Sequence, residues 1–215
     1  MGAHPTYIRT AVEASLRRLR TDRIDLYQLH SPDPSVPIAD TLGALDELVK
    51  VGKVREIGCS NFSAAQLHEA ESAVRSGGAR FVSVQNEYNL LHRAPEQDVL
   101  PECERENMAF LPFFPLASGL LTGKYRAGQP LPSGTRLKSV DDQQLAVVER
   151  LIHFAESRGH TILELAFSWL LSHNAVASVI AGATTAAQVR ANVAAANWTL
   201  AQAELTQIDQ LLNAA

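Results

Sequence analysis

The side chains with the clearest chemical potential follow short apolar runs of the sequence. His30 closes the run 24–30, Ser60 and Asn61 close a second run at 56–61, and Gln85 stands in a third that starts at residue 81. Imidazole, hydroxyl and amide groups that meet in one place suit a ligand carbonyl or carboxamide better than a metal ion or a phosphate. Two simpler interpretations stay open: a strand-end histidine bonded to a nearby carbonyl, and an asparagine that forms an ordinary polar turn.

A second group of residues could stack on an aromatic ring of a ligand and bind a phosphate. One of the adjacent aromatic residues Phe113 and Phe114 must face away from the core, where it offers a stacking surface. Ser118 and Lys124, further along, offer backbone N–H groups and an ammonium to an anion. The segment 119–125 lacks the spacing of a P-loop, which argues against a nucleoside triphosphatase.

A third candidate lies near the C-terminus, where the segment 180–184 leads into Thr185. A helix that starts there offers free N–H groups to an anion, although a plain capped helix explains the same residues. The motif GxGxxG follows none of the runs, which argues against a Rossmann dinucleotide fold, and HExxH and GxSxG are absent as well.

The elements that must position these residues alternate between strand and helix patterns. Strands are predicted at 24–30, 56–61, from 81, within 109–116 and at 177–183. Helices are predicted between them and after the last, and three capping boxes mark helix starts. These boxes pair Ser63 with Gln66, Thr161 with Glu164, and Thr185 with Gln188.

Strands that recur at this spacing with helices between them are typical of βαβ units around a parallel sheet, so the predicted class is α/β. Five strands suit a flavodoxin-like or Rossmann-like open sheet, whereas a closed (β/α)₈ TIM barrel needs eight strands and about 250 residues. Periodicity alone leaves both open. Composition does not shift along the chain, so we expect one domain over residues 1–215.

Composition indicates which classes of binding partner and which cellular compartment to expect. The formal net charge is -4, which gives no general attraction to nucleic acid or to an anionic membrane, and a small molecule is the expected partner. Cys59 and Cys103 form no CxxC motif, which argues against a zinc site and fits a reducing compartment. A signal-peptide pattern and an apolar run of about 18 residues are both absent, so we expect a cytoplasmic protein without a membrane span.

Taken together, five strings of the sequence resemble the aldo-keto reductase family, in its bacterial-type and potassium-channel β-subunit-like subgroup. They occupy residues 7–33, 52–63, 82–91, 112–125 and 178–195 in the family's order. The resemblance implies a (β/α)₈ barrel that binds NADPH, with NADH as the other candidate, and that reduces aldehydes and ketones to alcohols. It also implies that the present residues form only about five βα units of that barrel.

The resemblance also implies roles for single residues. His30 matches the active-site histidine that polarises the substrate carbonyl. The cofactor residues implied are Ser60, Asn61 and Gln85 at the nicotinamide carboxamide, Phe113 at the nicotinamide ring, Leu116, Ser118 and Lys124 along the pyrophosphate, and Gly182, Thr184, Gln188 and Asn192 at the adenosine. Strongly NADP-selective members carry a lysine and an arginine at the positions of Gly182 and Gln188.

One departure from the family concerns the proton donor. About three βα units precede the matching segment in the family and supply an aspartate, a proton-donating tyrosine and a lysine, for which we find no match. Tyr27 is three positions from His30 on one strand, so alternation places it on the opposite face. We therefore expect impaired catalysis, and exposed barrel edges that pair with another copy or with a further fragment. A non-catalytic nucleotide-binding or interaction module is the alternative.

Overall fold

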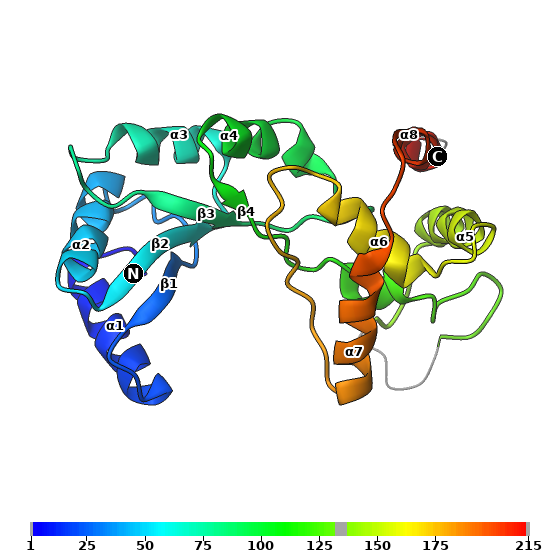
Figure 1. Ribbon diagram of the computed structural model, residues 1–215, viewed down its shortest axis with the longest axis horizontal. Helices are drawn as coiled ribbons and strands as arrows, with labels where there is room; N and C mark the ends of the chain where they lie inside the picture. The colour runs from blue at the N-terminus through cyan, green and yellow to red at the C-terminus, as the bar shows by residue number, and fades with distance from the viewer. Residues whose placement is uncertain (1, 132–136, 214–215) are drawn as a thin grey trace. The chain divides into compact units, whose positions relative to one another are not determined.

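A computed structural model describes residues 2–131 and 137–213 of the chain (Figure 1). These residues fall into two compact units. The first comprises Met1–Asn86 with Pro95–Leu111, and the second comprises Glu87–Ala94 with Pro112–Ala215. The single domain over residues 1–215 stays a prediction.

The first unit is a parallel sheet with helices between its strands, as the predicted α/β class requires. Its elements are α1 Pro5–Leu19, β1 Ile24–Leu29, α2 Ile38–Lys50, β2 Val54–Ser60, α3 Ala64–Ser72, β3 Phe81–Gln85, the 3-10 turn η1 Ala94–Glu96, α4 Val99–Arg105 and β4 Ala109–Phe110. The strands pair in the order β1-β2-β3-β4, and all three ladders are parallel. Strand order therefore follows chain order, as it does in a section of a barrel wall.

Local sequence explains these boundaries. The His4 side chain accepts a hydrogen bond from the Thr6 N–H and caps α1, which ends at Arg20 in the left-handed conformation. The predicted capping box of Ser63 and Gln66 is confirmed at the start of α3. The sheet packs through fully buried apolar residues, among them Ile57, Val84 and Phe110.

The second unit is helical among the described residues. It contains the 3-10 segment η2 Ala117–Thr122, then α5 Asp142–Glu156, α6 Ile162–Leu171, α7 Ala186–Ala194, η3 Ala195–Asn197 and α8 Gln202–Asn213. The predicted capping boxes of Thr161 with Glu164 and of Thr185 with Gln188 are confirmed at α6 and α7. Trp169, Tyr88 and Tyr125 form the centre of its core and are almost fully buried.

The predicted strand at 177–183 is wrong, since this segment has no strand conformation. Among the described residues, the backbone hydrogen bond of this segment runs from the Ile180 N–H to the Pro112 carbonyl at 3.0 Å. The facing segment contains Pro112 and Pro115, which lack N–H groups, so it cannot donate the alternate bonds of a ladder. Ile180 is also 42% exposed, so little apolar burial fixes an extended conformation.

Candidate active site

The predicted nicotinamide-end residues of the first unit do converge at the carboxyl ends of its strands. His30 follows β1 directly, Ser60 ends β2 and Asn61 follows it, and Gln85 ends β3. Ser60 lies opposite Gln85 in the register of the two strands. Because parallel strands end at the same edge of a sheet, residues up to 55 positions apart in the sequence become neighbours there.

Asn61 holds this group together through its side chain and its backbone. Its Nδ2 donates to the His30 carbonyl at 2.9 Å and to Ser60 Oγ at 3.2 Å. Its backbone N–H donates to the Gln85 carbonyl at 3.1 Å, and the Ser60 hydroxyl donates to the same carbonyl at 2.6 Å. Asn61 adopts φ 61°, in the left-handed region that asparagine tolerates better than most residues. The arrangement therefore ties β1, β2 and β3 together at their ends.

Several polar atoms of this group remain available to a ligand. Within the part of the chain that the structure describes, no hydrogen bond is formed by Asn61 Oδ1, by the Gln85 side-chain amide or by the His30 ring. An acceptor oxygen beside an amide that both donates and accepts matches the hydrogen-bonding pattern of a carboxamide. The donor set thus fits the nicotinamide end of a dinucleotide.

A second row of residues lies across the same three strands, two positions before His30, Ser60 and Gln85. Gln28, Gly58 and Ser83 stand opposite one another in the register. A Cβ at Gly58 would lie 2.4 Å from Ser83 Oγ and 3.0 Å from the Ser83 carbonyl oxygen. The absence of a side chain at Gly58 is therefore what lets the Ser83 side chain lie across β2. Our sequence reasoning missed this row, because a strand glycine gives no local sign of the partner that needs its space.

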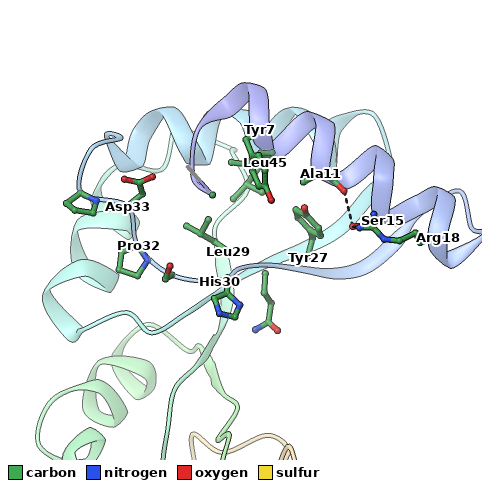
Figure 2. Close-up of a pocket in the computed structure, with 15 residues that line it drawn as sticks. Tyr7, Ala11, Ser15, Arg18, Tyr27, Leu29, His30, Pro32, Asp33 and Leu45 are labelled. Atoms are coloured by element: carbon green, nitrogen blue, oxygen red, sulfur yellow. Dashed lines mark hydrogen bonds between the residues drawn. The ribbon is translucent and has the colours of Figure 1, made fainter.

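Tyr27 lies on the side of β1 away from His30, as strand alternation predicts (Figure 2). Its ring points toward α1, into a pocket of about 520 Å³ that Tyr7, Ser15 and Arg18 also line. Burial raises the pKa of the Tyr27 phenol, and the nearby Tyr7 adds to this effect. Tyr27 is therefore a poor proton donor for a carbonyl bound at His30.

In the second unit, Phe113 and Phe114 pack edge to face with ring centroids 5.3 Å apart. The expectation that one of the two faces away from the core is confirmed: Phe114 is 49% exposed, and Phe113 is half-buried. Phe114 has φ 52°, and its carbonyl accepts a hydrogen bond from the buried Asn89 amide at 3.0 Å. Asn89 is a positioning residue that our sequence reasoning missed, since its burial depends on tertiary packing.

Lys124 of the second unit lies over a glycine backbone. A Cβ at Gly119, which has φ 101°, would lie 2.9 Å from Lys124 Nζ, so the side chain lies directly over the glycine backbone. Lys124 contacts the Tyr125 ring and forms no ion pair within the described residues. Leu116 precedes η2, and Ser118 lies inside it with φ 56°. The residues predicted to bind the pyrophosphate are thus close to one another in the sequence, and one of them, Lys124, has an ammonium group without an acidic partner among the described residues.

The predicted adenosine-end residues cluster at the start of α7. Gln188 Oε1 accepts hydrogen bonds from the Thr184 N–H at 2.7 Å and from the Thr184 hydroxyl at 3.0 Å. This acceptor therefore belongs to the capping arrangement, which leaves the Gln188 amide NH₂ for a ligand. Gly182 has open space at its Cβ position, and Asn192 is half-buried on the same helix.

A cluster of His68, Glu102 and Glu106 has metal-ligand chemistry but already contains a cation. Arg105 Nη2 lies 2.6 Å from Glu102 Oε1, 2.5 Å from Glu106 Oε1 and 3.0 Å from His68 Nδ1. The hydrogen bond from Arg105 lowers the pKa of Glu102. This guanidinium meets the charge requirement of the carboxylates, so the cluster fits a structural ion-pair network between α3 and α4.

Comparison with known proteins agrees with the resemblance. The sequence profile described as the aldo/keto reductase family matches residues 1–213. An aldo-keto reductase of Bacillus subtilis is 35% identical over 94% of this chain, and an NADH-specific methylglyoxal reductase of Escherichia coli is 35% identical over 98%. The glycerol dehydrogenase of Gluconobacter oxydans has a similar structure, with a TM-score of 0.86 and 33% identity over 98% of this chain.

The similarity does not extend over the whole of these proteins. The chain spans 62% of the length of the Bacillus relative, 65% of the Escherichia relative and 64% of the solved Gluconobacter chain. Within the described residues, no helix is long and apolar enough to cross a membrane.

Proposed function

The chain belongs to the aldo/keto reductase family, and on that premise we propose that it serves the reduction of small aldehydes or ketones by a reduced nicotinamide nucleotide. The observation that carries this proposal is the hydrogen-bonded group of His30, Ser60, Asn61 and Gln85. Within the described residues, this group leaves Asn61 Oδ1, the Gln85 side-chain amide and the His30 imidazole free to bind a ligand at one edge of the sheet. A carboxamide and a carbonyl are the ligands that such a set recognises.

In this proposal each residue has a defined task. Asn61 Oδ1 and the Gln85 amide hold the carboxamide, and the His30 ring donates a hydrogen bond to the substrate carbonyl oxygen and so polarises it. Phe113 stacks on the nicotinamide ring, Lys124 pairs with the pyrophosphate, and Thr184, Gln188 and Asn192 hold the adenosine. The bound nucleotide supplies a hydride when it is reduced.

We propose NADPH as the cofactor, with NADH as the close alternative. Gly182 and Gln188 carry no charge, and a 2′-phosphate is bound best by arginine or lysine. The relative from Escherichia coli that is named NADH-specific also favours testing both. The dissociation constants for NADPH and NADH, measured by paired titrations of the chain, test this preference.

A second function, nucleotide binding without turnover, is favoured by the position of Tyr27. Its phenol lies on the α1 side of β1, away from His30, so β1 supplies no proton donor to the carbonyl. General acid catalysis contributes about 10²–10⁴ in rate. A stopped-flow assay that follows the absorbance of the reduced nucleotide with a small aldehyde separates the two functions: turnover that His30→Ala abolishes supports the reductase, and tight binding without turnover supports the binding module.

A further inference from the structure

Backbone strain is concentrated in the segment 114–118 of the second unit, which we call the strained segment. Among the described residues, six non-glycine residues have a positive φ. Arg20 and Asn107 stand at the ends of α1 and α4, where a left-handed residue is a common helix stop. Three others belong to the strained segment: Phe114 with φ 52°, Ala117 with φ 45° and Ser118 with φ 56°. Helix termination does not account for these three, because α4 ends before the segment and α5 begins well after it.

The local sequence opposes the conformation of Phe114. This residue is followed by Pro115, and a proline ring favours an extended backbone at the residue before it. A side chain also crowds the backbone in the left-handed region, which is why glycine and asparagine are the usual residues there. A strained residue of this kind persists only where surrounding contacts determine its conformation. The contacts around Phe114 must therefore hold it in place.

Asn89 provides such a contact. It is 1% exposed, and its Nδ2 donates a hydrogen bond to the Phe114 carbonyl at 3.0 Å. Its Oδ1 accepts a hydrogen bond from the Leu91 N–H at 2.9 Å, which fixes the direction of the amide. The Ala117 N–H donates to the same Phe114 carbonyl at 3.0 Å. Two donors thus hold this carbonyl, one from inside the strained segment and one from a loop that is distant in the sequence.

The loop 87–94, which contains this asparagine, is itself anchored in the core of the second unit. Tyr88 is fully buried, its ring centroid lies 5.0 Å from that of Trp169, and its hydroxyl lies 2.8 Å from His173 Nε2. The Tyr88 N–H donates to the Phe113 carbonyl at 3.3 Å. The loop therefore forms a packed support for the start of the strained segment.

We propose that Asn89 is a positioning residue that holds the strained segment in the conformation that binds the nicotinamide nucleotide. This inference rests on the proposed function, in which Phe113 stacks on the nicotinamide ring and Lys124 pairs with the pyrophosphate. Since the rings of Phe113 and Phe114 pack edge to face, a turn of the Phe114 backbone also moves the Phe113 ring. Asn89 keeps the binding conformation populated before the nucleotide arrives, so loss of its amide lowers the affinity by the fraction of that conformation that is lost.

Hydrogen exchange without nucleotide tests whether Asn89 holds the segment. In Asn89→Ala the Ala117 amide, which donates to the Phe114 carbonyl, should exchange at least about tenfold faster than in wild type. The amide of the buried Leu165 in α6 should change by less than about twofold. Unchanged exchange at Ala117 would overturn the proposal. So would equal acceleration at Ala117 and Leu165, since Asn89 would then support the whole core and not this segment.

Two further variants separate the lost hydrogen bond from general damage. Asn89→Asp keeps the shape of the side chain and the acceptor for the Leu91 N–H, but has no NH₂ donor when ionised, so it should reproduce the faster exchange at Ala117 without a cavity. Ser168→Ala is the matched control in the same unit, because the buried Ser168 hydroxyl donates to the Ala195 carbonyl at 3.4 Å. This control should leave exchange at Ala117 within about twofold of wild type.

Calorimetric titration tests whether the held conformation matters for binding. Asn89→Ala should bind NADPH at least about tenfold more weakly than wild type does. It should bind AMP within about twofold of wild type, because AMP lacks the nicotinamide and its proposed contacts lie at α7. Equal losses of affinity for the two ligands would contradict a role at the strained segment.

A second substitution distinguishes positioning from a loss of core packing. Glycine adopts a left-handed conformation readily, so adding Ala117→Gly to Asn89→Ala should restore the affinity for NADPH at least about threefold. Ala127→Gly, at a residue without a positive φ, should restore none of it. Equal recovery by the two glycine substitutions, or no recovery by either, would remove strain from the explanation.

The outcomes separate this inference from the proposed function. If the wild-type chain binds neither NADPH nor NADH, the proposed function fails, whatever exchange shows about the hold of Asn89 on the segment. If the wild-type chain binds and Asn89→Ala binds equally well, the positioning role alone is wrong.

Discussion

Asn61 joins the ends of β1, β2 and β3 through its side-chain amide and its backbone N–H. The sequence predicts that Ser60 and Asn61 lie near His30 and Gln85, because all four stand at strand ends. It does not predict the left-handed backbone of Asn61 or the direction of its amide toward the His30 carbonyl, which depend on how closely β1 approaches β2. The roles of these residues in cofactor binding remain proposals.

Two substitutions of Asn61 separate its backbone role from its side-chain role. Asn61→Gly keeps the left-handed conformation and removes two side-chain hydrogen bonds, so dinucleotide affinity should fall about tenfold or more. Asn61→Ala removes the same bonds and adds about 1 kcal/mol of backbone strain, so it should also unfold at lower denaturant concentration than the glycine variant. Calorimetric titration and urea unfolding measure the two effects. Wild-type affinity in Asn61→Gly would remove Asn61 from the proposed site.

The neighbours of Gly58 leave no room for a side chain at this position of β2. Gly58→Ala should lower the free energy of unfolding by about 1–3 kcal/mol, because the new Cβ overlaps Ser83 Oγ and presses on the Ser83 backbone. Gly43→Ala is the matched control, since its Cβ would first meet the Arg75 side chain at 3.7 Å within a helix. The control should be neutral or stabilising by up to about 1 kcal/mol. Comparable losses in both variants would contradict the packing argument.

The two cysteines should be inert in the folded chain. Both are fully buried, and burial raises the pKa of Cys103 to about 12 and that of Cys59 well above its usual value. The thiols therefore stay protonated through the physiological range, and the thiolate is the reactive form. Ellman's reagent should report two thiols after denaturation and almost none before. Rapid modification of the native chain would show that one of them is accessible.

At the scale of elements, the local capping signals were predicted correctly, whereas one strand that depends on a distant partner segment was not. All three capping boxes are confirmed, because each is made by residues three positions apart. The strand at 177–183 failed because a strand also needs a partner that can donate, and Pro112 and Pro115 deny it one. The apolar pattern of residues 177–183 is visible in the sequence, but the sequence does not show which residues lie opposite them in the fold.

The start of α6 provides a pH-dependent test of a capping box. Thr161→Ala should cost about 1 kcal/mol of unfolding free energy, and Thr161→Ser, which keeps the capping oxygen, should cost much less. The Thr161 N–H donates to the Glu164 carboxylate and lowers its pKa, and the neighbouring His160 adds to this. A carboxyl with a lowered pKa in the folded state stabilises above its unfolded pKa and loses that contribution as the pH falls.

The stability difference between wild type and Glu164→Gln should therefore be largest at neutral pH and shrink as the pH falls through the lowered pKa of Glu164. Denaturant unfolding at a series of pH values follows it. A difference that stayed constant into acid would show that the ionised carboxylate contributes nothing at the cap.

At the scale of the whole molecule, family membership was predictable because its strings are spread along the chain in order, and the profile match over residues 1–213 confirms it. The α/β class follows from the alternation of patterns. The sequence could not show that α1 and β1 together line a pocket, because that depends on where Tyr7 and Arg18 point after folding. Substrate identity also lies beyond these patterns, since loops rather than strands set specificity.

A bound ligand should raise the stability of the folded chain. A nucleotide present at about 100 times its dissociation constant should add about 2.7 kcal/mol to the free energy of unfolding. Thermal unfolding with and without NADPH, with AMP as a control that lacks the nicotinamide, measures this increase. An equal effect of AMP would assign binding to the adenosine-end residues alone.

The most direct test of the proposed function is isothermal titration of the purified chain with NADPH and, separately, with NADH. We expect micromolar binding of at least one of them, about −8 kcal/mol, with an affinity ratio that reveals the preference set by Gly182 and Gln188. Absence of binding by both nucleotides would contradict the claim that His30, Ser60, Asn61 and Gln85 form a working nicotinamide site in this chain.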